Sequence, residues 1–276
     1  MKTWKRFVSH RSATTGGVIV LLVLTVAAGA PLVATQDPFF IDLPSRLQGP
    51  SAQHLLGTDN FGRDLWARIA FGARTTLTTA LMAVAISSLI GVPFGLISGY
   101  FGGIVDILVS RVVDVFLAFP VILLAVALVA VLGPSSTNVM LALGFVYWTQ
   151  YARVVRSSVL AVRREDYVVA ATAIGVGHGR IIVRHVLPNV LAPVIVVATL
   201  AMGTAIVAEA TLSFLGLGAP PPTPTWGWTL SFGLLYLRQA PHLSIFAGLA
   251  IMVSVLGFNL LGDGLRDLMD PRLKNR

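Results

Sequence analysis

Long runs of residues without a charged side chain alternate along the chain with short charged segments. The uncharged runs cover residues 12–36, 75–105, 115–152, 186–208 and 239–262. A helix rises about 1.5 Å per residue, so about 20 apolar residues cross the ~30 Å hydrocarbon layer of a membrane. The third run is too long for one helix, and the segment GPSSTN at residues 133–138 divides it into two. The pattern therefore predicts an all-α, polytopic membrane protein with six transmembrane helices.

A further uncharged segment, residues 210–237, does not fit this pattern. It contains prolines at positions 220, 221, 222 and 224. Proline cannot continue a helix, because it lacks an N–H and its ring clashes with the preceding turn. We expect an external loop with a short interfacial or re-entrant piece, whose tryptophans anchor it at the membrane interface.

The N-terminus admits two interpretations. The basic segment MKTWKRFVSHRS precedes an apolar run at residues 14–35, which resembles the basic and apolar regions of a signal peptide. The run is nevertheless long enough to span a bilayer. We interpret it as an uncleaved first transmembrane helix.

Composition supports a membrane protein and removes several kinds of chemistry. The 276 residues are 55% hydrophobic and only 12% charged, against about 25% charged in an ordinary soluble domain. The chain has no cysteine, which excludes disulfides, thiolate metal sites and cysteine nucleophiles, and its five histidines are scattered. We therefore expect no catalytic residues, no metal site and no cofactor in this chain.

The distribution of Lys and Arg predicts the orientation in the membrane. Of the 20 Lys and Arg residues, fifteen fall in segments that lie inside if the N-terminus is inside. The five outside are Arg46, Arg63, Arg68, Arg74 and Arg238. This asymmetry places both termini in the cytoplasm, and it accounts for the net charge of +8 without nucleic acid as a partner.

The longest polar external segment is the loop at residues 36–74. Its sequence DNFGRDLWARIAFGAR predicts an amphipathic helix after Gly62, with Leu65, Ile69 and either Gly72 or Ala73 on one face. We divide the chain into residues 1–74, comprising the first transmembrane helix and this outer loop, and residues 75–276, a core of five further transmembrane helices.

The inner segment at residues 164–189, REDYVVAATAIGVGHGRIIVRHVLPN, predicts a helix, a sharp turn and a second helix. Tyr167, Ala170, Ala171 and Ile174 fall on one helical face, which is small in the middle. The glycines at 175, 177 and 179 end the first helix. The segment is either a folded loop that joins two spans or a docking element for a cytoplasmic partner. The small apolar face favours docking, because a free loop has no reason to expose it to water.

This segment resembles the EAA signature of binding-protein-dependent ABC importer permeases. The signature reads Glu-Ala-Ala, three residues, Gly, nine residues, then Ile-x-Leu-Pro. The positions that match it are Ala170, Ala171, Gly175, Leu187 and Pro188. Val169 stands where the family often has Glu, and His185 stands where the pattern has Ile.

Further segments are similar to the oligopeptide, dipeptide and nickel branch of the family. They cover residues 54–77, 184–189, 208–227 and 259–273. As a set they resemble the second, C-type permease of the pair. The resemblance implies a type I importer fold in the cell (inner) membrane, a heterodimer with a homologous permease, two ATP-binding subunits and an extracytoplasmic solute-binding protein.

The resemblance also implies which residues take part in coupling to the ATPase. The residues expected to couple this chain to the ATPase are Tyr167, Ala170, Ala171, Ile174, Gly175, Leu187 and Pro188. No G-x-x-x-x-G-K-[ST] occurs in the sequence, so ATP and Mg are expected on the partner subunits. Asp114 and Glu209 are candidates for translocation or gating, because ionisable residues near transmembrane segments are often functional. Asp114 is also expected to pair with Arg111, three residues away.

The transported solute stays open. The leading hypothesis is an importer permease for peptides. The first alternative is a permease of the same class that carries nickel or another small solute. A secondary transporter or channel is a second alternative, but such proteins usually carry buried acids in mid-membrane. A structural anchor that recruits a cytoplasmic complex would need no elaborate outer loops.

Two features concern the helices themselves. Gly91, Gly95 and Gly99 stand four apart, the spacing that allows two transmembrane helices to approach closely. Pro93 and Pro120 are expected to kink their helices.

Overall fold

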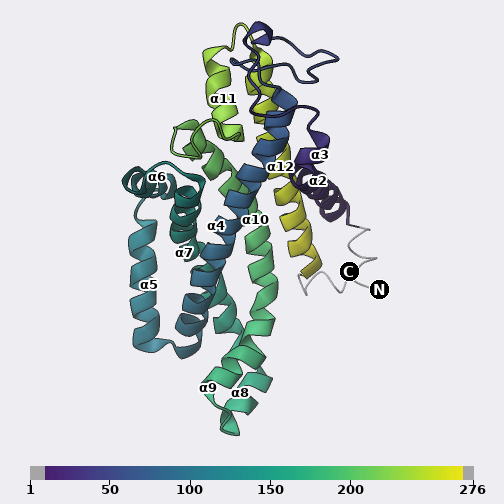
Figure 1. The fold of residues 1–276 in the computed structure, drawn as a ribbon. Coiled ribbons are helices and arrows are strands. Elements are labelled where there is room, and N and C mark those ends of the chain that lie inside the picture. Colours follow the sequence, from purple (N-terminus) through teal and green to yellow (C-terminus); the bar gives the residue numbers. More distant parts are fainter. Residues whose placement is uncertain (1–9, 270–276) are drawn as a thin grey trace.

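The computed structural model describes residues 10–269 of the chain, and these residues form an elongated bundle of helices (Figure 1). The helices are α2 (Arg11–Ala28), α3 (Ala30–Val33), the 3₁₀ helix η1 (Leu43–Ser45), α4 (Leu65–Phe101), α5 (Gly103–Leu117), α6 (Val121–Leu132), α7 (Ser136–Val162), α8 (Asp166–Ala173), α9 (His178–Ile181), the π-helical η2 (Ile182–Val186), α10 (Leu187–Phe214), α11 (Trp226–Leu235) and α12 (Pro241–Met269). Within the described residues the only β structure is an isolated bridge between Thr58 and Asp64.

Most of the predicted spans correspond to helices of the required length. The helices at 11–28, 65–101, 178–214 and 241–269 are each long and apolar enough to cross a membrane, and α5 with α6 makes a fifth if that bent pair is one span. The fourth predicted span corresponds to α7, whose 27 residues are more polar. The all-α polytopic fold is confirmed, and a total of six requires that α7 be counted.

The second predicted span begins ten residues too late. Asp64 caps α4, because its side chain accepts a hydrogen bond from the backbone N–H of Ala67. The amphipathic helix expected after Gly62 and the second span are therefore one helix of 37 residues. Leu65 and Ile69 are buried on it, as predicted. The proposed boundary between residues 74 and 75 lies inside this helix.

The third predicted span is wrong as a single helix that begins at residue 115. Helix α5 begins at Gly103, and the chain bends by 82° between α5 and α6. Pro120 is the last residue before α6 and lacks the N–H that a continuous helix would need. Pro93, in contrast, lies inside α4, which continues through it.

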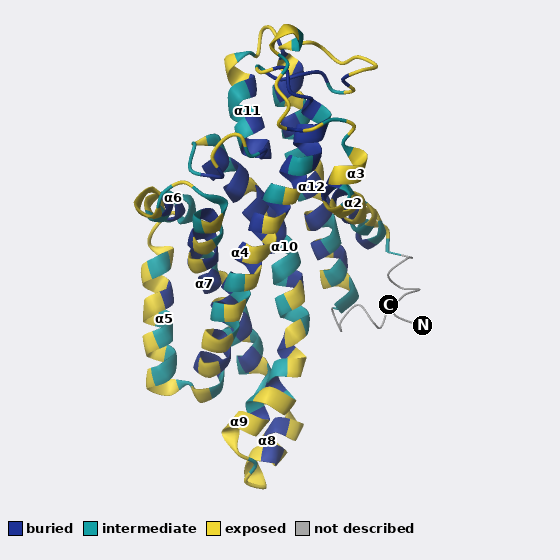
Figure 2. Ribbon diagram, in the orientation of Figure 1, coloured by how far each residue is buried: buried dark blue, intermediate teal, exposed yellow. Residues whose placement is uncertain are grey.

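Helices α4 and α7 pack closely through the three glycines of α4. A Cβ atom on Gly91 would lie 2.3 Å from the carbonyl oxygen of Trp148, and one on Gly95 would lie 2.6 Å from that of Ala152. Gly99 lies in the same way against Val159. The expected close approach of two helices is thus observed, and Figure 2 shows buried residues along the middle of the bundle and exposed ones on α5 and α8.

The uncharged segment 210–237 is partly helical and partly loop. Helix α10 runs on to Phe214, and α11 follows the proline-rich loop. Trp226 is only 2% exposed, and its Nε1 donates a hydrogen bond of 3.0 Å to the carbonyl oxygen of Ile69. The interpretation of Trp226 as an anchor at the membrane interface is therefore wrong, since the side chain fastens α11 to α4.

Candidate functional site

A helical finger, residues 166–181, projects from the lower end of the bundle in Figure 1 and consists of α8, a turn and α9. The turn ends α8 with two hydrogen bonds. The N–H of Val176 donates to the carbonyl of Ala171, and that of Gly175 donates to Thr172. This is the Schellman arrangement, which requires a left-handed residue. Gly175 has φ +78° and supplies it, as the sequence predicted.

The two sides of α8 have different surroundings. Val168 and Ala171 are buried and pack into a cluster with Ile181, Val186 and Val190. The prediction that Ala171 shares an exposed face with Tyr167, Ala170 and Ile174 is therefore wrong. The helix turns its 171 position toward its own protein, because the cap bond from Val176 folds the chain back over that residue.

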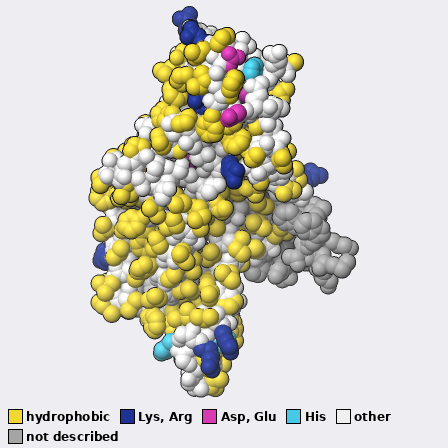
Figure 3. Space-filling model, viewed as in Figure 1, with side chains coloured by type: hydrophobic (Ala, Val, Ile, Leu, Met, Phe, Trp, Pro, Cys, Tyr) yellow, Lys and Arg dark blue, Asp and Glu magenta, His cyan; other side chains and the backbone are white. Residues whose placement is uncertain are grey.

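The other side of α8 is open and apolar. Tyr167, Val169 and Ala170 are exposed, and Ile174 at the tip is 81% exposed. The charged residues nearby are exposed as well, namely Arg164, Glu165, Asp166, Arg180 and Arg184. The finger thus presents a small apolar surface with a charged rim, and Figure 3 shows Lys and Arg side chains at this tip.

Helix α9, the second arm of the finger, continues into α10 without a break. Residues 178–214 form one helix, in which the π-helical turn η2 directly precedes Leu187 and Pro188. A π turn relieves the clash between a proline ring and the preceding carbonyls. Leu187 packs against the cluster below α4 and α7, whereas Pro188 is exposed. Both residues lie at the start of α10, beyond the finger, and not on the finger's open side.

Two contacts attach the finger to the lower end of α4. The hydroxyl of Tyr100 lies 3.0 Å from Nδ1 of His178, the first residue of α9. Nη1 of Arg163, which follows α7, donates to the carbonyl oxygens of Gly99 and Tyr100 at 3.0 and 3.3 Å. A cation at a helix C-terminus satisfies carbonyls that have no partner within the helix. Neither contact could be predicted from the sequence, because the partners are more than sixty residues apart.

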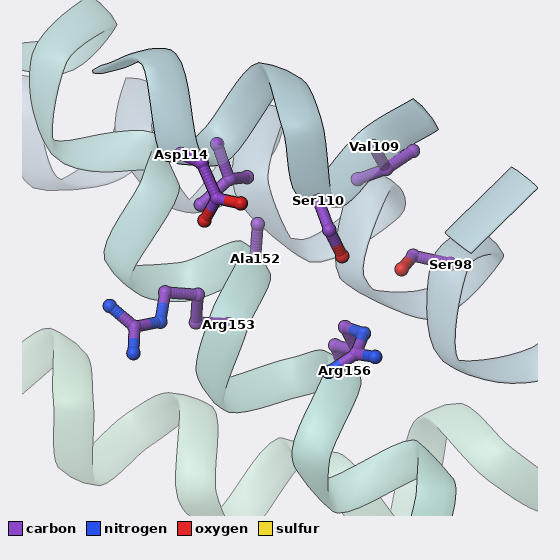
Figure 4. Close-up of a pocket in the computed structure, with 8 residues that line it drawn as sticks. Ser98, Val109, Ser110, Asp114, Ala152, Arg153 and Arg156 are labelled. Carbon is purple, nitrogen blue, oxygen red and sulfur yellow. The ribbon is translucent and has the colours of Figure 1, made fainter. Parts of the chain in front are cut away.

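A third polar group joins α4, α5 and α7 just above the finger. Arg156 donates from Nη2 to Oδ2 of Asp106 at 2.6 Å, and Ser98 donates to the same carboxylate. The predicted pair between Arg111 and Asp114 is not formed, and Asp114 has no ion pair among the described residues. Asp114 instead lines a cavity of about 260 Å³ with Arg153 and Arg156 (Figure 4).

Glu209 lies at the other end of the bundle, on α10. It is 1% exposed, and its Oε1 accepts a hydrogen bond of 2.7 Å from Ser213. Of the described atoms, none forms a hydrogen bond with Oε2, and the buried hydroxyl of Thr76 on α4 also lacks one. Glu209 is therefore enclosed by its own chain. The arrangement does not match an acid at the outer surface that meets a solute or an outer-loop arginine.

The loop between α3 and α4, residues 34–64, forms a compact structure at the end opposite the finger, and we call it the cap loop. Asp59 accepts hydrogen bonds from Nε of Arg63 at 2.7 Å and from the backbone N–H groups of Phe61 and Arg63. Arg68 approaches the same carboxylate at 3.4 Å, and His54 lies 3.0 Å from Asp64. The sequence predicted a structured loop here but not these pairs.

No group of three or more metal-ligating side chains occurs within residues 10–269. What the structure offers is an apolar bundle with a projecting finger, and Figure 3 shows apolar side chains over most of its midsection. These features define a polytopic membrane protein with a projecting helical finger at one end.

Comparison with known proteins identifies the family. Residues 91–275 match the model of the binding-protein-dependent transport system inner membrane component, and residues 2–50 match the N-terminal transmembrane domain of oligopeptide transport permease C. The chain belongs to this family of importer permeases.

Similar proteins extend over almost the whole chain. The dipeptide transport system permease of Alkalihalophilus pseudofirmus is 46% identical, with 99% of this chain and 90% of the relative covered. A putative peptide permease of Brucella abortus is 44% identical (99% and 92%), and a glutathione permease of Pectobacterium atrosepticum is 40% identical (99% and 91%).

A solved structure supports the fold. A chain of the MetNI methionine ABC transporter in an inward-facing form matches with a TM-score of 0.61 at 19% identity, over 74% of this chain and 97% of that chain. At this identity the match shows the permease fold, and the expected type I importer architecture agrees with it.

Proposed function

We propose that this chain is one of two paired permeases of an ATP-driven importer, and that the complex carries peptides across the inner membrane. The names of the relatives support a peptide solute, since they include dipeptide, peptide and glutathione permeases. An extracytoplasmic binding protein delivers the solute, and both chain termini face the cytoplasm. The excess of Lys and Arg on the finger side supports this orientation.

Two ATP-binding subunits supply the energy, and they hold ATP and Mg. One of them docks on the finger. The observation that carries this proposal is the open side of α8, where Tyr167, Val169 and Ile174 expose apolar side chains at the tip of a projecting element. An exposed apolar patch with a polar rim is typical of a surface that another protein covers.

The connection between finger and bundle suits the transmission of movement. The second arm of the finger is part of the helix that reaches residue 214 near the opposite end, and the first arm follows α7 directly. Tyr100 and Arg163 fix the base of the finger to α4. When the ATPase pair closes, a finger held in this way moves three transmembrane helices together.

Cross-linking tests the docking surface. The chain has no cysteine of its own, so Ile174→Cys and Tyr167→Cys each introduce one thiol in the assembled complex. We expect both to cross-link to an ATP-binding subunit. The matched control is Ala171→Cys, which lies in the same helix but faces inward. A pattern in which Ala171→Cys links and Ile174→Cys does not would refute the docking surface.

Transport measurements test the coupling. Gly175→Leu forces a branched side chain into a left-handed conformation, although no atom lies within 4 Å of the position of its Cβ. We expect a complex that assembles and hydrolyses ATP but transports peptides poorly. Gly175→Asn is the control, because Asn tolerates this conformation. Full coupled transport by the Leu variant would refute the proposal that the finger transmits movement from the ATPase to the bundle.

A further inference from the structure

One face of the bundle carries polar side chains in the middle of helices that are otherwise apolar. Tyr147 on α7, Thr204 and Thr211 on α10, and Asn259 on α12 line a groove of about 360 Å³. Thr204 and Asn259 are exposed. Tyr147, Thr204 and Asn259 each lie at least ten residues from either end of their helices, and Thr211 lies three residues from the end of α10. The nearest charged residues along these helices are the buried Glu209, two residues before Thr211, and Asp263, four residues after Asn259. The groove is therefore at the depth of the hydrocarbon layer.

The groups in this groove have hydrogen-bonding capacity that the protein does not use. The hydroxyls of Thr204 and Thr211 donate to carbonyls of their own helix and keep their acceptor lone pairs free. Neither the amide of Asn259 nor the hydroxyl of Tyr147 has a hydrogen-bond partner within residues 10–269. In lipid, each unsatisfied polar group would cost several kcal/mol. This face therefore does not meet lipid tails.

Glycine at position 203 determines how Asn259 lies. A Cβ atom at Gly203 would be 2.7 Å from Oδ1 of Asn259. The absence of a side chain there lets the amide approach α10 closely. The polar positions of α7 continue toward the finger end, because Gln150 and Arg153 follow Tyr147 at three-residue intervals. Both line a second cavity, of about 500 Å³.

Helix α2 provides a contrast on another face of the bundle. Its exposed side consists of Val18, Leu21, Leu22 and Leu24. Two hydroxyls are exposed on the same helix, those of Thr15 and Thr25. The hydroxyl of Thr25, which lies among the leucines, donates to the carbonyl of Leu21. This helix has the surface expected against lipid, and the groove does not.

We propose that the groove formed by Tyr147, Thr204, Thr211 and Asn259 is the part of the solute pathway that this chain supplies, and that it holds the main chain of a peptide. The proposal rests on the proposed function. Amide and hydroxyl groups complement the N–H and C=O groups of a peptide backbone and do not select among side chains. Because the groove carries no charge, it binds weakly enough for the solute to leave toward the finger end.

Thiol labelling in the reconstituted complex tests this placement. We introduce Thr204→Cys or Asn259→Cys into the cysteine-free chain and treat the complex with a charged, water-soluble methanethiosulfonate, with Leu21→Cys as the control. We expect labelling of this chain at 204 and 259 but not at 21, and at least fivefold slower labelling when the binding protein and peptide are present without ATP hydrolysis. Labelling only by a membrane-soluble maleimide would overturn the proposal. A cross-link from position 204 to the partner permease without water access would do the same.

A second variant tests the hydrogen bonding. Asn259→Leu keeps the size of the side chain and removes its amide, and we expect peptide transport to fall about fivefold to tenfold, the range for one hydrogen bond, with ATP hydrolysis retained. Unchanged peptide transport would count against main-chain recognition. If the wild-type complex transports peptides with ATP while positions 204 and 259 stay unlabelled, the pathway placement fails and the proposed function stands. If the wild-type complex transports no peptide, the proposed function itself fails.

Discussion

The cap loop and the helical finger occupy opposite ends of the same bundle and are held by different forces. The cap loop is fixed by buried charges, because Asp59, Arg63 and Arg68 are each about 5% exposed or less and share one ion-pair cluster. The finger has no such cluster. It is held by a few apolar residues, a glycine turn and two polar contacts, and one of its sides is bare.

The difference shows how each end is suited to its environment. Buried ion pairs fix a single geometry, because any movement exposes an unpaired charge to a medium of low dielectric. The cap loop is therefore rigid and closed on itself, with a further contact from His242 to the carbonyl of Thr58 at 3.3 Å. The finger leaves its apolar side open. A protein that covers this side would therefore stabilise the finger further.

The largest expected effect is at the cap loop. Asp59→Ala leaves Arg63 and Arg68 buried without their counterion, and we expect a loss of about 3–5 kcal/mol in the free energy of unfolding. Thermal unfolding in detergent would measure it. The exposed Asp37, replaced by Ala, is the control and should cost less than about 1 kcal/mol. Equal losses in the two variants would show that the cluster does not hold the loop.

The finger should respond next. Ile181 is fully buried at its base, and Ile181→Ala should cost about 2–5 kcal/mol locally. Hydrogen exchange should become faster over residues 166–181 and stay unchanged in the cap loop. Ile174→Ala changes a side chain at the exposed tip. In the isolated chain, it should not change the rate of hydrogen exchange in the finger. Faster exchange in the cap loop would mean that the two ends are not independent.

The glycine turn allows a finer test. Gly175→Ala places a side chain at φ +78°, and we expect a cost of about 1–2 kcal/mol. Gly177→Ala is matched to it, since Gly177 has φ −60° and open space around it. Thermal unfolding and exchange of the finger should change in the first variant only. A similar cost in both would show that the left-handed conformation of Gly175 is not its cause.

The smallest effects compare one hydrogen bond at each end. Trp226→Phe removes the bond to the carbonyl of Ile69, and Tyr100→Phe removes the contact with His178. We expect about 0.5–1.5 kcal/mol for the buried Trp226 and less for Tyr100, because water replaces a partner at an exposed position. Unfolding of the two variants side by side would measure this. A larger loss at Tyr100 would show that the finger is more tightly held than its contacts indicate.

Much of the fold could be predicted from local pattern. Uncharged runs located most of the spans, Gly175 located the turn of the finger, and the spacing of Gly91, Gly95 and Gly99 predicted a close helix contact. The helix after Gly62 was predicted, but its continuity with the second span was missed, because Arg68 and Arg74 interrupt the apolar run and the ion pair that buries Arg68 comes from the folded cap loop. A kink at Pro120 was predicted, but its size of 82° was not, because a proline alone does not determine how far the chain turns.

The candidate site divides in the same way. The sequence by itself determined a membrane-spanning helical chain with a glycine-hinged projection, because hydrophobic length and backbone conformation are local properties. Only the tertiary structure decided that Ala171 faces inward, that Asp106 pairs with Arg156 and that Tyr147 and Asn259 share a groove. These facts depend on how helices rotate about their axes and on contacts across fifty or more residues, and the packing of neighbouring helices fixes both.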